Sequence, residues 1–222
     1  MTKLQHNTEF LCQEHLGVII NTDGVPLFKS SQTSLWQVYL EIGNYPPAIR
    51  FRMENTICGF WVGQSKPKLE LILTPILKEI DRLNILGFSF DSPEGMKTVR
   101  IKLLFGVFDL VAKAKVLNMH QFNGNCGCPT CLHPGEHQGS RVYDPNTSYP
   151  IRTVEGIEEA GRRAVAHKQG IKGESPLHNY MHLVNGVPPD YMHCVLEGVT
   201  KAMLKLWANP SQKQTIFYSK RS

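Results

Sequence analysis

The chain has 222 residues, of which 41% are hydrophobic, so it is not a disordered or collagen-like chain and is long enough for one large or two small domains. Its 24 Lys and Arg exceed its 19 Asp and Glu, and the resulting mild basicity is compatible with a polyanionic partner without requiring one. Six cysteines are too few for a disulfide scaffold and favour an intracellular, reducing compartment. No apolar signal segment opens the sequence, and its longest apolar run, 103–108, is too short to span a membrane.

Three segments in the first third of the chain predict strands. They lie at residues 17–21, 34–42 and 57–62. The first segment is a β-branched run, and the Thr-Asp-Gly sequence that follows it at 22–24 is typical of a turn.

A helix and a long strand are predicted next. Apolar residues spaced by three to four favour a helix with Thr74 as its cap and Pro75 in its first turn. Residues 69–73 are either an earlier turn of this helix or an extended lead-in. Residues 99–108 alternate and then become wholly apolar, which predicts a strand that is buried on both faces. Residues 110–119 then predict a short helix.

The last part of the chain begins with an irregular segment at 121–149 that is rich in Gly, Pro, Asn and His. Such a long unpatterned stretch usually needs a function or a metal to order it. A helix is predicted at 157–168, and a second, strongly amphipathic helix is predicted at 190–207.

Two aspartates stand where predicted strands end. Asp23 follows the first strand, and Asp109 follows the long apolar strand 86 residues later. Carboxylates brought together at the strand ends of an α/β sheet can hold Mg²⁺ for attack on phosphate. Alternatively, Asp23 is a turn residue and Asp109 caps the next helix. Nearby basic residues, Lys113 and Lys115 among them, could meet phosphates, although a solvated face is the commoner arrangement.

Cys128-Pro129-Thr130-Cys131 is the sharpest local motif. Its spacing lets two thiolates occupy adjacent corners of a zinc tetrahedron, with His133 or His137 as nearby further ligands. The alternative is a thioredoxin-like redox pair, but the segment before the motif lacks the strand pattern that such a pair follows.

His193 is the distant zinc-ligand candidate. It lies three residues after Asp190, so both side chains share one face of a helical turn. Asp190 can ligate, cap the helix or orient the imidazole. His193 is otherwise an ordinary residue at a helix start.

Four segments taken together carry a resemblance to a known family. They are Asn21–Ser31 with Ser34-Leu35-Trp36, Lys113–Met119 with Gln121–Gly124, Cys128–Glu136, and Asp190–His193 with Gly198–Lys201. In this combination the chain resembles, from about residue 14 to 207, the transposase domain of Tnp2-type elements related to the CACTA superfamily.

The resemblance implies an α/β fold of RNase H-like type, which is a mixed sheet with flanking helices and an inserted zinc-knuckle subdomain. The core would begin in residues 1–120, the zinc-knuckle insertion would occupy 121–150, and 151–222 would form a helical segment with the DxxH helix. Asp23 and Asp109 would be the first two carboxylates of a DDE-type site that binds two Mg²⁺ or Mn²⁺ ions. The candidate ligands for a structural Zn²⁺ are Cys128, Cys131, His133 and His193.

The function that the resemblance implies is metal-dependent cleavage and strand transfer of DNA at transposon ends. It also implies a nuclear location, is compatible with a homo-oligomer and gives no membrane partner. A DDE site needs a third acidic residue, and Glu197 is the only acidic residue after His193. Cys126 stands where the family usually has an aromatic residue. These departures suggest a fragment or decayed remnant, so the alternative is an inactive, domesticated, zinc-ordered module that binds DNA or protein. A thiol redox protein is a third hypothesis.

Overall fold

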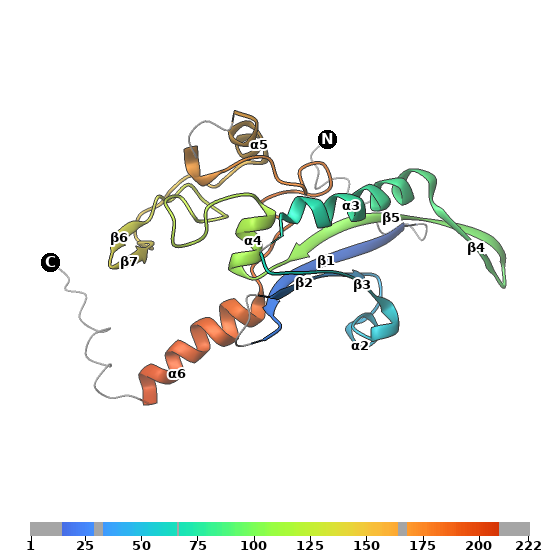
Figure 1. Ribbon diagram of the computed structural model, residues 1–222, viewed down its shortest axis with the longest axis horizontal. Helices are drawn as coiled ribbons and strands as arrows, with labels where there is room; N and C mark the ends of the chain where they lie inside the picture. Colours follow the sequence, from blue (N-terminus) through green and yellow to red (C-terminus); the bar gives the residue numbers. More distant parts are fainter. Residues whose placement is uncertain (1–14, 29–32, 66, 164–167, 209–222) are drawn as a thin grey trace. The chain divides into compact units, whose positions relative to one another are not determined.

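The structure is a computed structural model that describes residues 15–28, 33–65, 67–163 and 168–208. The chain divides into two compact units, Met1–Pro188 and Pro189–Ser222, and each is described by itself. The first unit contains a five-stranded mixed sheet with helices (Figure 1). The predicted mixed α/β class is therefore confirmed.

The five strands of the sheet have the spatial order β3-β2-β1-β5-β4. Their bounds are β1 (His15–Pro26), β2 (Ser34–Ile42), β3 (Thr56–Gly63), β4 (Phe88–Ser92) and β5 (Gly95–Val107). β1 is parallel to β5, and the other neighbours are antiparallel. The three strands predicted in the first third are thus present, whereas β4, which forms a hairpin with β5, was not predicted.

One prediction about the strands is wrong. β1 continues through residues 22–24 instead of turning there, because it pairs with β2 along this stretch and Asp23 lies opposite Gln37. β5 contains the strand predicted at 99–108 as far as Val107, and none of its residues 101–107 is exposed on either face. Its first half belongs to the exposed hairpin with β4, so only its second half reaches the core.

The longest described helix, α3 (Leu69–Leu86), includes residues 69–73, so the alternative that they form an earlier turn of this helix is confirmed. Its buried residues are Leu69, Leu73, Leu77 and Ile80, whose spacing forms one apolar stripe across the position of the proline. Pro75 therefore lies inside the helix, and the predicted cap at Thr74 is wrong. The residue four before Pro75 is Leu71, which is exposed, so the carbonyl that Pro75 leaves without an amide partner stands on the solvent side.

The other described helices of the first unit are short. They are α2 (Pro47–Arg50), a 3₁₀ turn at Met53–Asn55, α4 (Leu110–Val116), α5 (Val154–Arg163) and a 3₁₀ turn at Lys168–Gly170. The helices predicted at 110–119 and 157–168 correspond to α4 and α5, although residues 164–167 lie outside the described part. Within the segment predicted as irregular, β6 (Glu136–Gln138) and β7 (Ser140–Val142) form a small hairpin.

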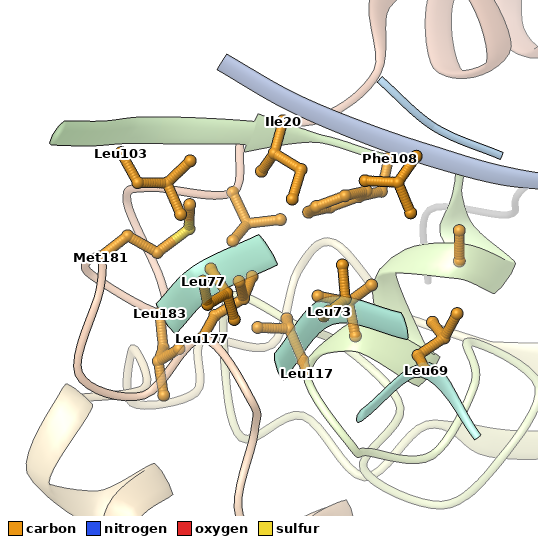
Figure 2. Packing of buried hydrophobic residues seen from close by; sticks show 14 of the residues in the cluster. Ile20, Leu69, Leu73, Leu77, Leu103, Phe108, Leu117, Leu177, Met181 and Leu183 are labelled. Atoms are coloured by element: carbon orange, nitrogen blue, oxygen red, sulfur yellow. The ribbon is translucent and has the colours of Figure 1, made fainter. Parts of the chain in front are cut away.

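The core lies between the sheet and α3 and is completed by a late segment of the first unit (Figure 2). Ile20 and Leu103 from the sheet and Leu77 from α3 belong to one buried cluster with Leu177 and Leu183. The amide of Gly106 in β5 also donates a hydrogen bond of 2.8 Å to the carbonyl of Gly186. This returning segment anchors the end of the first unit to β5.

The described residues of the second unit, 189–208, contain a continuous helical stretch that consists of a π-helix at Met192–Thr200 followed by α6 (Lys201–Ala208). The helix predicted at 190–207 is thus present. Among the described helices, none combines the length and the apolar character needed to cross a membrane.

Candidate functional site

The pairing of β1 with β5 places the two predicted aspartates towards the same end of these neighbouring strands. Asn21 lies opposite Val107 in this parallel pair, and its Nδ2 donates a 2.6 Å hydrogen bond to the Val107 carbonyl. Asp23 and Asp109 each lie two residues further along, so the register carries both to the same end of the two strands. They line one pocket of about 590 Å³, which we call the carboxylate pocket.

Each of the two carboxylates accepts one local backbone hydrogen bond. Asp109 is the N-cap of α4, and its Oδ1 accepts from the Ala112 amide at 2.5 Å. Asp23 Oδ1 accepts from the Gly24 amide at 2.6 Å. The helix-cap interpretation of Asp109 is therefore correct. These bonds use one oxygen of each carboxylate, so capping and cation binding are compatible.

Lys115 brings a positive charge to the carboxylate pocket. It lines the pocket from α4, and its Nζ lies 3.9 Å from the centroid of the buried Trp36 ring, in a cation–π contact. Lys113, two residues earlier in α4, is buried. Lys113 and Lys115 therefore do not lie on the solvated face that the sequence favoured, because α4 packs into the core with Trp36.

Cys128 and Cys131 come together in a turn, which we call the cysteine turn (residues 126–131). Their sulfur atoms are 3.4 Å apart, and the Cys131 amide donates to Cys128 Sγ at 3.4 Å. The distance far exceeds the ~2.05 Å of a disulfide. It is close to the ~3.8 Å that separates two sulfurs of a tetrahedral zinc site with Zn–S bonds of ~2.3 Å. Burial raises the pKa of the Cys131 thiol.

His133 is buried beside the cysteine turn, but its imidazole already has a partner. Nδ1 accepts a 2.9 Å hydrogen bond from the Gly135 amide, and the ring contacts Tyr143 and Tyr149. In a neutral imidazole this places the proton on Nε2, which is buried and has no hydrogen-bond partner among the described residues. Zinc binding by His133 therefore requires the bond to Gly135 to break or the ring proton to leave.

Arg152 contacts the cysteine turn, and the sequence did not predict this contact. It is only 5% exposed, and its Nε and Nη2 donate to the carbonyls of Cys128 and Cys126 at 2.8 and 2.7 Å. Burial lowers the pKa of the Arg152 guanidinium, and the nearby cysteine sulfurs oppose that shift. No local signal could have identified it, because it lies 24 residues from Cys128 in the chain.

The remaining candidates do not join a metal cluster within the described residues. His137 is exposed on β6, while His193 and Glu197 belong to the second unit. There, His193 Nδ1 and Asp190 Oδ2 are 2.5 Å apart, and Asp190 Oδ1 accepts from the Met192 amide at 2.9 Å. Asp190 thus both orients the imidazole and caps the helix. In the described parts of the chain, no three His, Cys, Asp or Glu side chains group closely enough to hold a metal ion.

Comparison with known proteins adds no assignment. No protein-family model and no curated protein matches the sequence. The resemblance to CACTA-related transposases therefore stays a prediction.

Proposed function

We propose that the chain carries a transposase-type catalytic core of RNase H-like fold that cleaves and joins DNA with Mg²⁺ or Mn²⁺ held by Asp23 and Asp109. The observation that carries the proposal is their shared pocket. Two carboxylates that are 86 residues apart in the sequence reach one pocket because β1 and β5 are parallel and in the required register. The same pocket contains Lys115.

The donor set of the carboxylate pocket fits a hard divalent cation. Asp23 and Asp109 each keep one oxygen beyond their bond to a backbone amide, and carboxylate oxygens are the ligands that Mg²⁺ prefers. Two bound ions would supply an activated water or 3′-hydroxyl and would stabilise the leaving oxygen. Lys115 would attract the phosphodiester group electrostatically and help to position it.

The cysteine turn supports a structural zinc site as part of the same proposal. Its sulfur spacing suits two ligands of one ion, and the Cys131 amide donates to the Cys128 sulfur, which stabilises a thiolate. His133 would complete the local set after exchanging its bond to Gly135, with His193 as the more distant candidate. The proposal implies transposon-end DNA as the partner and a nuclear location.

A second candidate function is an inactive, zinc-ordered module that binds DNA or protein. Among the described residues that line the carboxylate pocket, Asp23 and Asp109 are the only acidic ones, whereas a DDE site needs a third. Glu197, the sequence candidate for that role, is exposed on the π-helix of the second unit.

The two functions are separated by a plasmid-nicking assay with the full chain in Mg²⁺ or Mn²⁺. We expect the unaltered protein to nick DNA and D109N to lose about 100-fold in rate, which corresponds to ~2.7 kcal/mol of transition-state stabilisation. Asparagine still caps a helix, so D109N removes the charge and keeps the cap. D91N, at an exposed aspartate on β4, is the matched control.

Nicking that survives in D109N would contradict the proposal and indicate another site or a contaminating nuclease. Absence of nicking in the unaltered protein, combined with DNA binding, would favour the inactive module.

A further inference from the structure

We propose that Cys128 and Cys131 form a thiol–disulfide exchange site, with small disulfides as its substrate class, when no metal is bound to the cysteine turn. The inference goes beyond the proposed function and rests neither on zinc nor on the DNA chemistry at the carboxylate pocket. Such exchange needs only two sulfur atoms within reach of each other. The sulfurs of Cys128 and Cys131 meet this condition, because they lie 3.4 Å apart.

The backbone of the pair is held at both ends by one residue. The Arg152 amide donates to the Thr130 carbonyl at 2.9 Å, directly before Cys131. The Arg152 guanidinium donates to the carbonyls of Cys128 and Cys126 at 2.8 and 2.7 Å. To form a disulfide, the two sulfurs must approach from 3.4 Å to ~2.05 Å. Rotation of the two cysteine side chains supplies this movement while the backbone keeps its hydrogen bonds.

The two sulfurs have different hydrogen-bond roles. Cys128 Sγ accepts from the Cys131 amide and from the Cys131 thiol, each at 3.4 Å. Hydrogen bonds donated to a sulfur favour its charged form, and the thiolate is the nucleophile in exchange. Cys131 acts as the donor in both contacts. Cys128 is therefore the attacking sulfur, and Cys131 is the resolving thiol.

The reaction has two steps that balance. The Cys128 thiolate attacks one sulfur of a small disulfide, which forms a mixed disulfide and releases the first small thiolate. The Cys131 thiol then gives its proton to solvent, and its sulfur attacks Cys128 Sγ and releases the second small thiolate. The pair is oxidised by two electrons, and the small disulfide is reduced to two thiols; excess small thiol reverses both steps. The second step starts within the ~3–3.5 Å that favours reaction between positioned atoms.

The surroundings of the pair permit this reaction and differ from those of a thioredoxin-like motif. Both cysteines are partly exposed, so a small disulfide can reach them. Neither lies in a helix, and the next regular element along the chain is the short strand β6. In a thioredoxin-like motif the helix N-terminus stabilises the thiolate. Here the Cys131 amide and thiol take that role through local hydrogen bonds.

The test is incubation of the reduced full chain, stripped of metal and kept in chelator, with glutathione disulfide under anaerobic conditions. After alkylation of the remaining thiols, peptide mapping by mass spectrometry locates each product. We expect an intramolecular bond between Cys128 and Cys131, which excess glutathione reduces again. C58S, at an exposed cysteine on β3, is the control and should form this bond at the rate of the unaltered chain.

Two serine variants separate the roles of the sulfurs. C131S should keep a stable glutathione adduct on Cys128, because the resolving thiol is absent. C128S should form its adduct on Cys131 about tenfold more slowly, because that sulfur accepts neither hydrogen bond. Equal rates of adduct formation in the two variants would overturn the assignment of Cys128 as the attacking sulfur.

The unaltered chain alone can overturn the exchange site, so the inference does not depend on the folding of a variant. Glutathione adducts that remain on Cys128 and Cys131 without ring closure would show that the sulfurs do not react with each other. A bond from either of them to Cys126 would show that another pair is the reactive one. Persistence of the Cys128–Cys131 bond in C126S would support the assigned pair.

A parallel measurement keeps the zinc part of the proposed function separate. Co²⁺ is titrated into the reduced chain without chelator, because its absorption reports coordination by thiolates. Ring closure in chelator together with tight Co²⁺ binding would support both the exchange site and the metal site. Ring closure without Co²⁺ binding would support the exchange site and contradict the zinc site. Plasmid nicking by D109N decides the carboxylate pocket in either case.

Discussion

Asp23 lies on β1 and Asp109 follows the end of the neighbouring strand β5, whereas Cys128 and Cys131 lie three residues apart in a turn outside regular structure. The carboxylate pocket is assembled by long-range strand pairing, and its frame is the apolar core under β1 and β5. The cysteine turn is held by two backbone carbonyls that both accept hydrogen bonds from the buried Arg152 side chain.

The difference concerns where each site gets its rigidity. Sheet register is fixed by many ladder bonds and by burial of one face, so the carboxylate pocket needs no ligand to keep its shape. The cysteine turn lies among irregular segments with little apolar burial of their own, so a bound ion would supply much of its stability. The following predictions test this contrast.

The largest expected effect is that of zinc removal on the segment around the cysteine turn. Structural zinc in small domains contributes apparent binding free energies of about 10–16 kcal/mol, and that energy is folding energy. We expect a strong chelator to reduce the protection of the Leu132 and Arg152 amides against hydrogen exchange by at least ~100-fold. The amides of β1 and β2 should change little. Identical exchange of both groups with and without chelator would show that the two regions do not differ in this way.

Sequence reasoning found the carboxylate pocket because its information is carried by patterns that sheets require. The β-branched run before Asp23 and the apolar run before Asp109 predicted two strands, and the parallel pairing of these strands brings the two aspartates to one pocket. The turn expected at 22–24 was wrong because Thr-Asp-Gly also fits a strand when a neighbouring strand supplies the pairing, as β2 does. Local propensity was overridden by tertiary contact.

The cysteine turn was only partly predictable. Its two cysteines are marked by their spacing, but Arg152 is an isolated arginine in the sequence, and its role depends on a fold-level return of the chain. The hydrogen bond from Gly135 that occupies His133 Nδ1 is likewise invisible in the sequence. Pro75 was wrongly placed in the first turn of its helix. The helix begins at Leu69, because burial of the apolar stripe outweighs the one backbone hydrogen bond that the proline removes.

Alanine substitutions at Gly127 and Gly139 are expected to have a smaller effect, and their comparison tests the cysteine turn alone. A Cβ on Gly127 would stand 1.9 Å from the Gln121 carbonyl oxygen, so G127A must displace backbone, at a cost of about 1–3 kcal/mol or more. We expect G127A to weaken Co²⁺ binding and to lower the melting temperature of the metal-loaded chain. Gly139 has open space around it and a φ of +75°, so G139A should cost only ~1 kcal/mol and leave metal binding intact. Equal metal affinity in both variants would contradict the geometry of the turn.

The smallest effect separates the two roles of Asp109 in the carboxylate pocket. Its side chain caps α4, and loss of an N-cap residue costs about 1 kcal/mol. D109A should therefore lower the free energy of unfolding by this amount in urea denaturation, while D109N should unfold near the midpoint of the unaltered chain. Both variants should lose metal-dependent nicking to the same degree, because both lack the charge. If D109N is as unstable as D109A, the carboxylate charge itself stabilises the end of β5 and the start of α4. The carboxylate pocket would then depend on a charged side chain for its shape, as the cysteine turn does on Arg152. The two sites would differ only in that strand pairing assembles the pocket.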